Sequence, residues 1–293
     1  MMRSGYVAIV GRPNVGKSTL LNRLIGQKIS ITSSRPQTTR HRILGISTRP
    51  DAQIVYIDTP GLHLGSRRAM NRVMNRAAAG TLEEADLAVF VVEVPQWTEE
   101  DEHVLGLLRE AGIPVVLAIN KVDRLTDKSR LLPYIASLRD RHEFADVVPL
   151  SALKGTQVEG FEEVVARLLP EGPALFPEDQ VTDRSERFLV AELVREQLMR
   201  RLGQEVPYGT AVEIENYAEE EGLVRIAALI WVERDGHKAI VIGKGGKMLK
   251  AIGQDARLAM ERLLGTRVYL QLWVKVKENW SDDERALRGL GYE

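Results

Sequence analysis

Eight residues near the N-terminus fit the pattern G-x-x-x-x-G-K-[ST], in the context that this pattern needs. The apolar segment 6–10 precedes them and Thr19 follows, so they lie between a predicted buried strand and a predicted helix start. In such a loop, backbone N–H groups turn toward phosphate oxygens, the lysine places its charge near the β- and γ-phosphates, and the hydroxyl can ligate Mg²⁺. A flexible glycine-rich turn that matches by chance is the alternative. The predicted phosphate-binding residues are Gly11, Arg12, Pro13, Asn14, Val15, Gly16, Lys17 and Ser18.

A second loop indicates which base the nucleotide carries. The apolar segment 115–119 runs into Asn120, Lys121, Val122 and Asp123, an N-K-x-D sequence. A carboxylate at Asp123 can accept hydrogen bonds from both N–H donors of guanine, whereas adenine would leave it buried and unpaired, at a cost of about 1–3 kcal/mol. An isolated N-K-x-D in a helix-capping loop would mean little, but behind a phosphate loop it predicts guanine binding.

Three further loops follow predicted strands, where an open parallel sheet places its ligands. Asp58 is a predicted Mg²⁺ ligand, and the backbone N–H of Gly61 is placed to meet the γ-phosphate. Ser151 and Ala152 would supply backbone N–H groups to guanine. The polar segment 33–40 offers two switch hydroxyls, Thr38 and Thr39, of which we favour Thr39 as the metal ligand together with Ser18 and Asp58.

These five loops, in this order, resemble the translation-factor-related GTPases. The sequences Gly11–Ser18 and Pro36-Gln37-Thr38-Thr39-Arg40 are similar to the branch that contains Era and the tandem GTPases. The resemblance implies GTP and GDP as ligands, Mg²⁺ as cofactor, and slow GTP hydrolysis with Lys17 as a catalytic residue. The tandem GTPases would need a second phosphate loop, and the chain has one such pattern.

The chain departs from familiar switch GTPases where a glutamine would orient the attacking water. Leu62 and His63 stand there, and leucine has no hydrogen-bonding group. Asn14 matches an asparagine that coordinates potassium in relatives, so the resemblance implies K⁺ as a second cofactor and Asn14 as a catalytic residue. His63 as the water-orienting group is the alternative.

Composition and charge limit the remaining classes. The 293 residues are enough for about two domains, 44% are hydrophobic and none is cysteine, so no disulfide framework can form. No apolar run approaches the roughly 18 residues of a membrane span, and the N-terminus leads directly into a predicted strand without room for a cleavable signal. A cytoplasmic location and a monomer are expected.

The pattern of apolar residues predicts an α/β fold for the first part of the chain. Strands near 5–10, 43–48, 53–58, 86–92, 114–119 and 146–150 alternate with helices near 17–26, 68–80, 98–111, 128–141 and 159–169. This is a doubly wound, mostly parallel sheet, and the short connection 49–52 predicts one antiparallel hairpin at its edge. The prediction is a GTP-binding domain over 1–170 and a proline-rich linker over 171–182.

A second, smaller α+β domain is predicted over 183–293. Asp183 to Glu186 has the spacing of a capping box at the head of a helix that extends to about Leu202. Phe188, Ala191, Arg195, Leu198 and Leu202 are expected along one side of that helix. Strands near 209–217 and 223–233 follow, and then a G-x-x-G loop that enters another helix.

The G-x-x-G loop is the candidate RNA-binding element. It comprises Gly243, Lys244, Gly245 and Gly246, with Lys247 next. Such a loop lets a nucleic-acid backbone approach peptide N–H groups, although many helix–helix corners also use glycine. Residues 234–277 hold ten Lys and Arg against three acids, a balance of +7 within a chain of net charge −1, which indicates a polyanion partner.

The element order in this half is similar to the type II KH domain, and the two halves together resemble the Era family. That resemblance implies binding of single-stranded RNA at the 3′ end of 16S rRNA, a role in maturation of the small ribosomal subunit, and a switch driven by GTP hydrolysis. Trp231 and Trp273 are expected in the core. For Trp280 two alternatives stay open, packing within the protein and contact with RNA. The competing classes are an RNA chaperone without turnover and a membrane-associated GTPase whose basic residues contact lipid.

Overall fold

The computed structural model describes residues 2–61, 69–203 and 205–290, and these form two compact units. The first unit comprises Met1–Ser30, Thr39–Ser66 and Met74–Asp183. The second comprises Arg184–Glu293 together with two short segments from the first half of the sequence, Ile31–Thr38 and Arg67–Val73. The second unit is therefore discontinuous in sequence.

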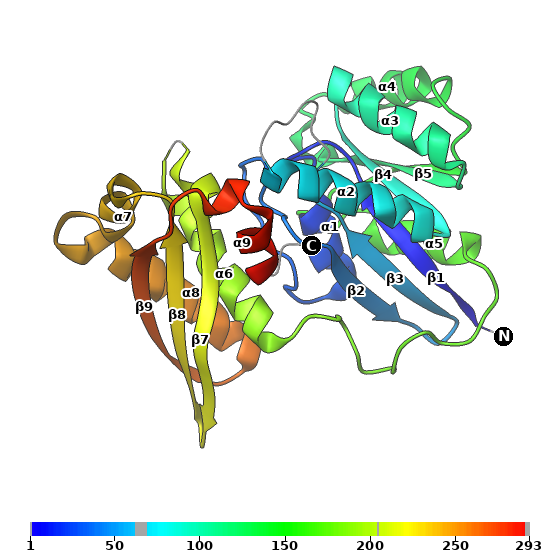
Figure 1. Cartoon of the computed structure of the whole chain (residues 1–293). Coiled ribbons are helices and arrows are strands. Elements are labelled where there is room, and N and C mark those ends of the chain that lie inside the picture. The colour runs from blue at the N-terminus through cyan, green and yellow to red at the C-terminus, as the bar shows by residue number, and fades with distance from the viewer. Residues whose placement is uncertain (1, 62–68, 204, 291–293) are drawn as a thin grey trace. The chain divides into compact units, whose positions relative to one another are not determined.

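The first unit is built around a six-stranded sheet with strand order β2-β3-β1-β4-β5-β6 (Figure 1). The strands are β1 (Arg3–Val10), β2 (Ile43–Thr48), β3 (Ala52–Asp58), β4 (Leu87–Glu93), β5 (Val115–Asn120) and β6 (Asp146–Pro149). β2 and β3 pair antiparallel and all other neighbours pair parallel, which confirms the predicted edge hairpin. The strands β3 and β5 are buried along their whole length, as expected for a sheet covered on both faces.

Helices follow the strands as the sequence pattern predicted. They are α1 (Lys17–Ile25), α2 (Ala69–Glu84), α3 (Glu99–Ala111), α4 (Leu131–Arg139) and α5 (Val158–Leu168). Leu105, Leu108 and Leu138 pack with Phe90 and Leu117 of the sheet in one hydrophobic core. The carboxyl ends of β1, β3 and β5 carry the loops that contain the predicted nucleotide ligands.

The second unit is a three-stranded sheet with strand order β7-β8-β9. β7 (Thr210–Glu220) pairs antiparallel with β8 (Leu223–Val232), and β8 pairs parallel with β9 (Arg267–Val276). The helices α6 (Glu186–Arg201), α7 (Asp235–Ile242) and α8 (Lys247–Leu264) pack on one face of this sheet, and a short helix, α9 (Glu284–Gly289), follows it. Ile226, Ile230, Val268 and Val274 face the helices within the core.

The start of α6 differs from the prediction. Ser185 is the N-cap, and its side chain accepts a hydrogen bond from the backbone N–H of Phe188. Asp183, predicted as the cap, instead accepts the backbone N–H of Leu44 at 3.1 Å. The predicted apolar side is also only partly right, because Val190 and Val194 lie in the core and most of α6 is buried.

The burial of α6 on a second side has a specific cause, the segment Ile31–Thr38. The Glu196 carboxylate accepts the backbone N–H of Thr32 at 2.9 Å, and Arg200 donates to the carbonyl oxygen of Thr32 at 3.1 Å. Arg195 donates to the carbonyl oxygen of Thr38. Arg195 and Glu196 are buried because a separate chain segment bonds to them, whereas Arg200 stays about half exposed.

The tryptophans of the second unit lie partly where the sequence predicted and partly elsewhere. Trp280 is fully buried and its indole N–H donates to the carbonyl oxygen of Gly209 at 3.3 Å, so it is a core residue. Trp273 was predicted in the core, but its side chain points from β9 to the side opposite the helices and is 43% exposed. Trp231 was also predicted in the core, and this is wrong as well: it is only partly buried, on that same side, and its indole N–H donates to Glu213 at 2.9 Å.

Among the helices of the described residues, none combines the length and the apolar character needed to cross a membrane.

Candidate nucleotide site and nucleic-acid interface

The phosphate loop joins β1 to α1, and its backbone takes conformations that its sequence permits. Gly16 caps α1 in a left-handed conformation with φ 106°, and Asn14 has φ 65°. A Cβ atom at Gly16 would lie 2.3 Å from Nδ2 of Asn120, so no larger residue fits there without displacing the guanine loop. Backbone N–H groups in the first turn of a helix have no helical partner, and such groups favour a bound anion.

Lys17 lies at the base of this loop. Its ammonium group donates to the carbonyl oxygens of Gly11 at 2.8 Å and Arg12 at 3.0 Å. Burial lowers the pKa of Lys17 to about 8, and the positive charge of Arg12 adds to this effect while the carboxylate of Asp58 opposes it. A negative phosphate beside this group would favour its charged form.

Three hydroxyl groups converge on one carboxylate next to the loop. Oγ of Ser18 and Oγ of Ser30 each lie 2.8 Å from Oδ2 of Asp58, and Oγ1 of Thr39 lies 2.8 Å from Oγ of Ser18. Burial raises the pKa of Asp58, whereas the charge of Lys17 and the three hydroxyl hydrogen bonds work in the opposite direction. Ser30 carried no motif, and only its place in the fold identifies it as part of the site.

These oxygens fit a divalent cation. Oδ1 of Asp58 is buried, and no hydrogen-bond partner is found for it among the described residues. A buried carboxylate oxygen without a partner is costly, and oxygen ligands are those that Mg²⁺ prefers. Of the two switch hydroxyls, that of Thr39 lies at this cluster, while that of Thr38 donates to the carbonyl oxygen of Arg35 at 2.7 Å.

The guanine loop is bonded to the phosphate loop. Nδ2 of Asn120 donates to the carbonyl oxygen of Val15 at 2.8 Å, and Nζ of Lys121 donates to the carbonyl oxygen of Asn14 at 2.6 Å. Oδ1 of Asp123 accepts the hydroxyl of Ser151 at 2.5 Å, which orients this carboxylate. The structure thus brings together the residues predicted to read the base and those predicted to hold the phosphates.

Ser151 and Ala152 lie beside this loop, but their N–H groups already have partners. The N–H of Ala152 donates to Oδ1 of Asn120 at 3.0 Å, and the N–H of Ser151 donates to the carbonyl oxygen of Thr156 at 3.1 Å. A contact from these groups to a guanine oxygen would have to share or replace those bonds. The hydroxyl of Ser151 acts through Asp123, a role that its sequence context did not indicate.

An ion-pair network supports the site from outside. Arg12 contacts the buried carboxylate of Asp101 at 3.2 Å and that of Glu93 at 3.5 Å. Glu93 also pairs with Lys121 at 2.7 Å. Glu93 and Asp101 link the two loops through their charges, although neither was predicted as a site residue. Asp101 also forms the capping box of α3 with Thr98.

The water-orienting position cannot be placed, since Leu62 and His63 lie outside the described residues. Gly61 is described and lies against the phosphate loop. A Cβ atom added to Gly61 would lie 3.1 Å from Cγ of Pro13, so a side chain there would crowd the phosphate loop.

The G-x-x-G loop of the second unit joins α7 to α8. All three of its glycines have φ between 59° and 73°, and a Cβ atom at Gly243 would lie 2.6 Å from Cβ of Met248. Lys244 and Lys247 flank the turn, with Lys247 as the first residue of α8. The loop therefore presents open backbone and two cations, as an RNA cleft requires.

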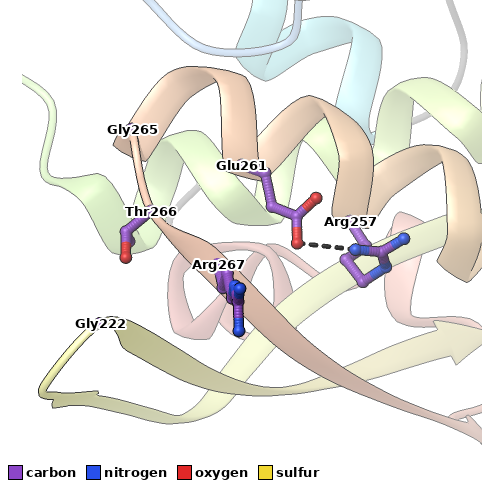
Figure 2. A pocket seen from close by; sticks show the side chains of 6 residues that line it. All are labelled: Gly222, Arg257, Glu261, Gly265, Thr266 and Arg267. Atoms are coloured by element: carbon purple, nitrogen blue, oxygen red, sulfur yellow. Dashed lines mark hydrogen bonds and ion pairs between the residues drawn. The ribbon is translucent and has the colours of Figure 1, made fainter.

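A pocket of about 680 Å³ lies where α8 ends and β9 begins (Figure 2). Arg257, Glu261 and Arg267 line it, together with the turns at Gly222 and Gly265. Glu261 pairs with Arg257 at 2.6 Å and also accepts the N–H of Val268 at 3.1 Å. Arg267, the first residue of β9, contributes a positive charge to this pocket.

Two protein-family models match the chain. A model described as a 50S ribosome-binding GTPase matches residues 6–121, and a KH domain model matches residues 205–281. Two similar proteins are GTPase Era of Xanthomonas axonopodis pv. citri (strain 306) and GTPase Era of Stenotrophomonas maltophilia (strain K279a). The first is 60% identical over 291 residues and the second 59% over 289, and each match covers 99% of this chain and 97% of the relative.

Two solved structures match nearly the whole chain, each with 41% identity and a TM-score of 0.95. One is a variant of Era from Aquifex aeolicus bound to GDP and AlF4⁻, and the match covers 99% of both chains. The other is Era in complex with MgGDPNP and nucleotides 1506–1542 of 16S ribosomal RNA, and the match covers 100% of this chain and 99% of that one.

Proposed function

The chain belongs to the Era family of GTPases, and on that premise we propose that it binds the 3′ end of 16S ribosomal RNA and acts in maturation of the small ribosomal subunit. In this proposal GTP hydrolysis switches the protein between RNA-bound states. The observation that carries it is the pairing of two sites in one chain. One unit brings a phosphate loop, a guanine loop and the cluster at Asp58 together, and the other presents the G-x-x-G loop.

The residues of the first unit have separate roles in GTP binding. The carboxylate of Asp123 accepts the two guanine N–H donors, and the ammonium group of Lys17 moves from backbone carbonyls to phosphate oxygens. Ser18, Thr39 and Asp58 would hold Mg²⁺. When bound, this ion neutralises charge that develops on the phosphate oxygens.

Hydrolysis would be slow in the isolated protein. No arginine finger is evident among the described residues near Lys17, so turnover on the order of 10⁻³–10⁻² per second is expected. The γ-phosphate would order the segments 33–42 and 58–80, and its loss would release them. GTP and GDP forms must then differ in RNA affinity, with a coupling free energy of about 1–3 kcal/mol.

We assign the two activities to domains by sequence range. Residues 1–170 form the GTP-binding domain, 171–182 the linker and 183–293 the RNA-binding domain. The RNA cleft in this assignment comprises Gly243 to Gly246 and Lys247. A KH cleft holds about four unpaired nucleotides, whereas the RNA bound to the relative spans nucleotides 1506–1542. An RNA of that length extends beyond the cleft.

The test is GTP turnover with and without an RNA that copies nucleotides 1506–1542, referred to below as the long RNA. A scrambled RNA and a Gly245→Asp variant serve as controls, because a Cβ atom at Gly245 meets no atom within 4 Å but its φ of 59° disfavours a side chain. Cognate RNA should stimulate wild-type turnover and leave the variant unchanged. If the wild-type protein bound the long RNA no more tightly than the scrambled RNA, the RNA half of the proposal would be refuted.

The second cofactor is proposed to be K⁺, with Asn14 as its ligand. The support is the position of Asn14 in the phosphate loop with φ 65°. Hydrolysis should be faster in KCl than in NaCl at equal ionic strength, and Asn14→Ala should abolish that difference. Equal turnover of the wild type in the two salts would remove this role.

The proposed location is the cytoplasm, where the protein would act as a monomer with a peripheral membrane fraction. The basic residues of 234–277 are the candidate lipid contact. Vesicles with 30% anionic lipid should carry the protein upward in flotation, and the long RNA should compete. Failure to float at any anionic content would exclude the membrane fraction.

A further inference from the structure

The outward face of β9 carries five exposed side chains in a regular order. They are Arg267, Tyr269, Gln271, Trp273 and Lys275, called here the β9 row, and every second residue between them faces the helices. The row is cation, ring, amide, ring, cation. Its Tyr269 and Trp273 are 46% and 43% exposed, which is unusual for large aromatic residues on a strand.

The row lies at an edge that the fold leaves accessible. β9 is the last strand of the sheet, and α7 and α8 pack on its other face (Figure 1). The G-x-x-G loop joins those two helices, so the β9 row and the predicted RNA cleft belong to different faces of the sheet. The row is a separate surface and not a part of the cleft.

The chemistry of the row and its neighbours fits nucleic acid. β8 and β9 contain no Asp or Glu. Acids on β7 pair with cations of this face: Glu215 with Lys275 at 3.5 Å and Glu220 with Arg225 at 2.8 Å. The guanidinium of Arg225 lies 5.3 Å from the ring centre of Tyr269, and the ammonium of Lys277 lies 5.7 Å from that of Trp231. Cations beside exposed rings are the pattern that holds phosphates while bases stack.

The spacing allows each ring its own base. Tyr269 and Trp273 are four residues apart on one strand, so they are separated by ~13 Å along it. Arg267 extends the row to the pocket shown in Figure 2, which Arg257 also lines, paired with Glu261 at 2.6 Å. The amide of Gln271 donates to the hydroxyl of Tyr269 at 3.2 Å, which orients that ring.

We propose that the β9 row is a second RNA-binding surface, on which unpaired nucleotides of an RNA held in the G-x-x-G cleft stack on Tyr269 and Trp273. The inference rests on the proposed function, since it needs an RNA longer than the cleft. A protein partner would bury the same rings, but the alternation of cations and rings and the lack of acids on β8 and β9 favour a polyanion.

The test measures binding of the long RNA and of a tetranucleotide to the full chain. One variant combines Tyr269→Ala with Trp273→Ala, and its matched control combines Tyr269→Phe with Trp273→Phe and keeps both rings. Leu258→Ala, which removes a side chain of 41% exposure from α8, controls for loss of surface area. Thermal unfolding shows that each variant is folded.

The alanine pair should weaken long-RNA binding at least about fivefold, whereas the phenylalanine pair and Leu258→Ala should stay within twofold. The tetranucleotide should bind all four proteins equally. Ultraviolet irradiation of long RNA that contains 5-bromouridine should crosslink to the β9 peptide.

Three results would overturn the inference while the proposed function survives. They are long-RNA binding by the alanine pair that equals wild type, loss of tetranucleotide binding in that pair, and crosslinks that avoid β9 altogether. Wild-type protein that binds neither RNA would instead refute the proposed function.

Discussion

The side-chain amide of Asn120 donates to the carbonyl oxygen of Val15 at 2.8 Å, so the residue that begins the guanine loop also fixes the middle of the phosphate loop. Its Oδ1 accepts the N–H groups of Lys121 at 2.7 Å and Ala152 at 3.0 Å. One buried side chain thus joins three loops that come from distant parts of the sequence.

Replacement of Asn120 should therefore weaken both folding and nucleotide binding. Asn120→Ala leaves three backbone groups without a partner and should lower the unfolding free energy by about 1–3 kcal/mol, measured by urea denaturation. Asn120→Asp keeps the acceptor but places a buried carboxylate oxygen against the carbonyl oxygen of Val15, so its loss should be at least as large. Equal stability of all three proteins would show that these bonds contribute nothing.

Asp123 should determine which base is bound. An amide at this position supplies a donor that xanthine can accept and removes the acceptor that guanine needs. Asp123→Asn should lower GTP affinity at least about tenfold and raise affinity for xanthosine triphosphate, as measured by competition with a fluorescent nucleotide. Ser151→Ala, which removes the 2.5 Å hydrogen bond to this carboxylate, should weaken GTP binding without changing the base preference.

Lys17 should make stability depend on pH in the alkaline range. Burial lowers its pKa to about 8 from 10.5, so above pH 8 the unfolded chain holds this proton while the folded protein has released it. Stability of nucleotide-free protein should therefore rise with pH, by roughly 2 kcal/mol between pH 7 and 9.5.

The comparison for Lys17 is the variant Lys17→Met, which cannot titrate at that position. Urea denaturation of both proteins at pH 7 and 9.5 removes the contribution of other groups, because these are shared. The difference in unfolding free energy between the two proteins should change by roughly 2 kcal/mol between pH 7 and 9.5. A constant difference would mean that the lysine keeps its ordinary pKa.

Thr39 and Thr38 form a natural pair of test and control. The hydroxyl of Thr39 lies 2.8 Å from that of Ser18 at the metal cluster, while that of Thr38 bonds to Arg35 and Ser33. Thr39→Ala should reduce GTP turnover by at least tenfold at limiting Mg²⁺, and added Mg²⁺ should restore part of it. Thr38→Ala should stay within about twofold. Reversed effects would exchange the two roles.

Glu196 should be a large contributor to the stability of the second unit. Its carboxylate is fully buried, pairs with Arg200 at 2.8 Å and accepts the N–H of Thr32 at 2.9 Å. Glu196→Ala leaves the N–H group of Thr32 without its acceptor, whereas the half-exposed Arg200 keeps its bond to the Thr32 carbonyl oxygen. The loss should be about 1–3 kcal/mol, measured by thermal and urea unfolding. Glu186→Ala, at the exposed start of the same helix, should cost under 1 kcal/mol.

The strands and most loops of the nucleotide site could be predicted because each depends on neighbours in sequence. Apolar runs end in polar loops, and the order of these loops places them at one edge of a parallel sheet. Ser30 could not be predicted, because its hydroxyl reaches Asp58 only through the path that the chain takes after α1. The roles of Glu93 and Asp101 likewise depend on the folded arrangement.

The helix α6 and the strand β9 show why burial was harder to predict. A helix with one apolar side was expected, but residues 31–38 bond to Arg195 and Glu196 and bury a polar side as well. Trp273 was expected in the core because tryptophan is usually buried. It faces outward because the helices cover only one face of the sheet, and alternation along β9 then places it on the other.

The hydrogen bonds of Thr32 and Thr38 to α6 have a practical consequence for dissecting the protein. A fragment that stops at residue 183 would lack Arg195, Glu196 and Arg200. Residues 31–38, which lead into Thr39, would then lose their hydrogen bonds to α6. A fragment that starts at 184 would expose two buried charges. Measurements on either fragment would therefore not reproduce the behaviour of the same residues in the intact chain.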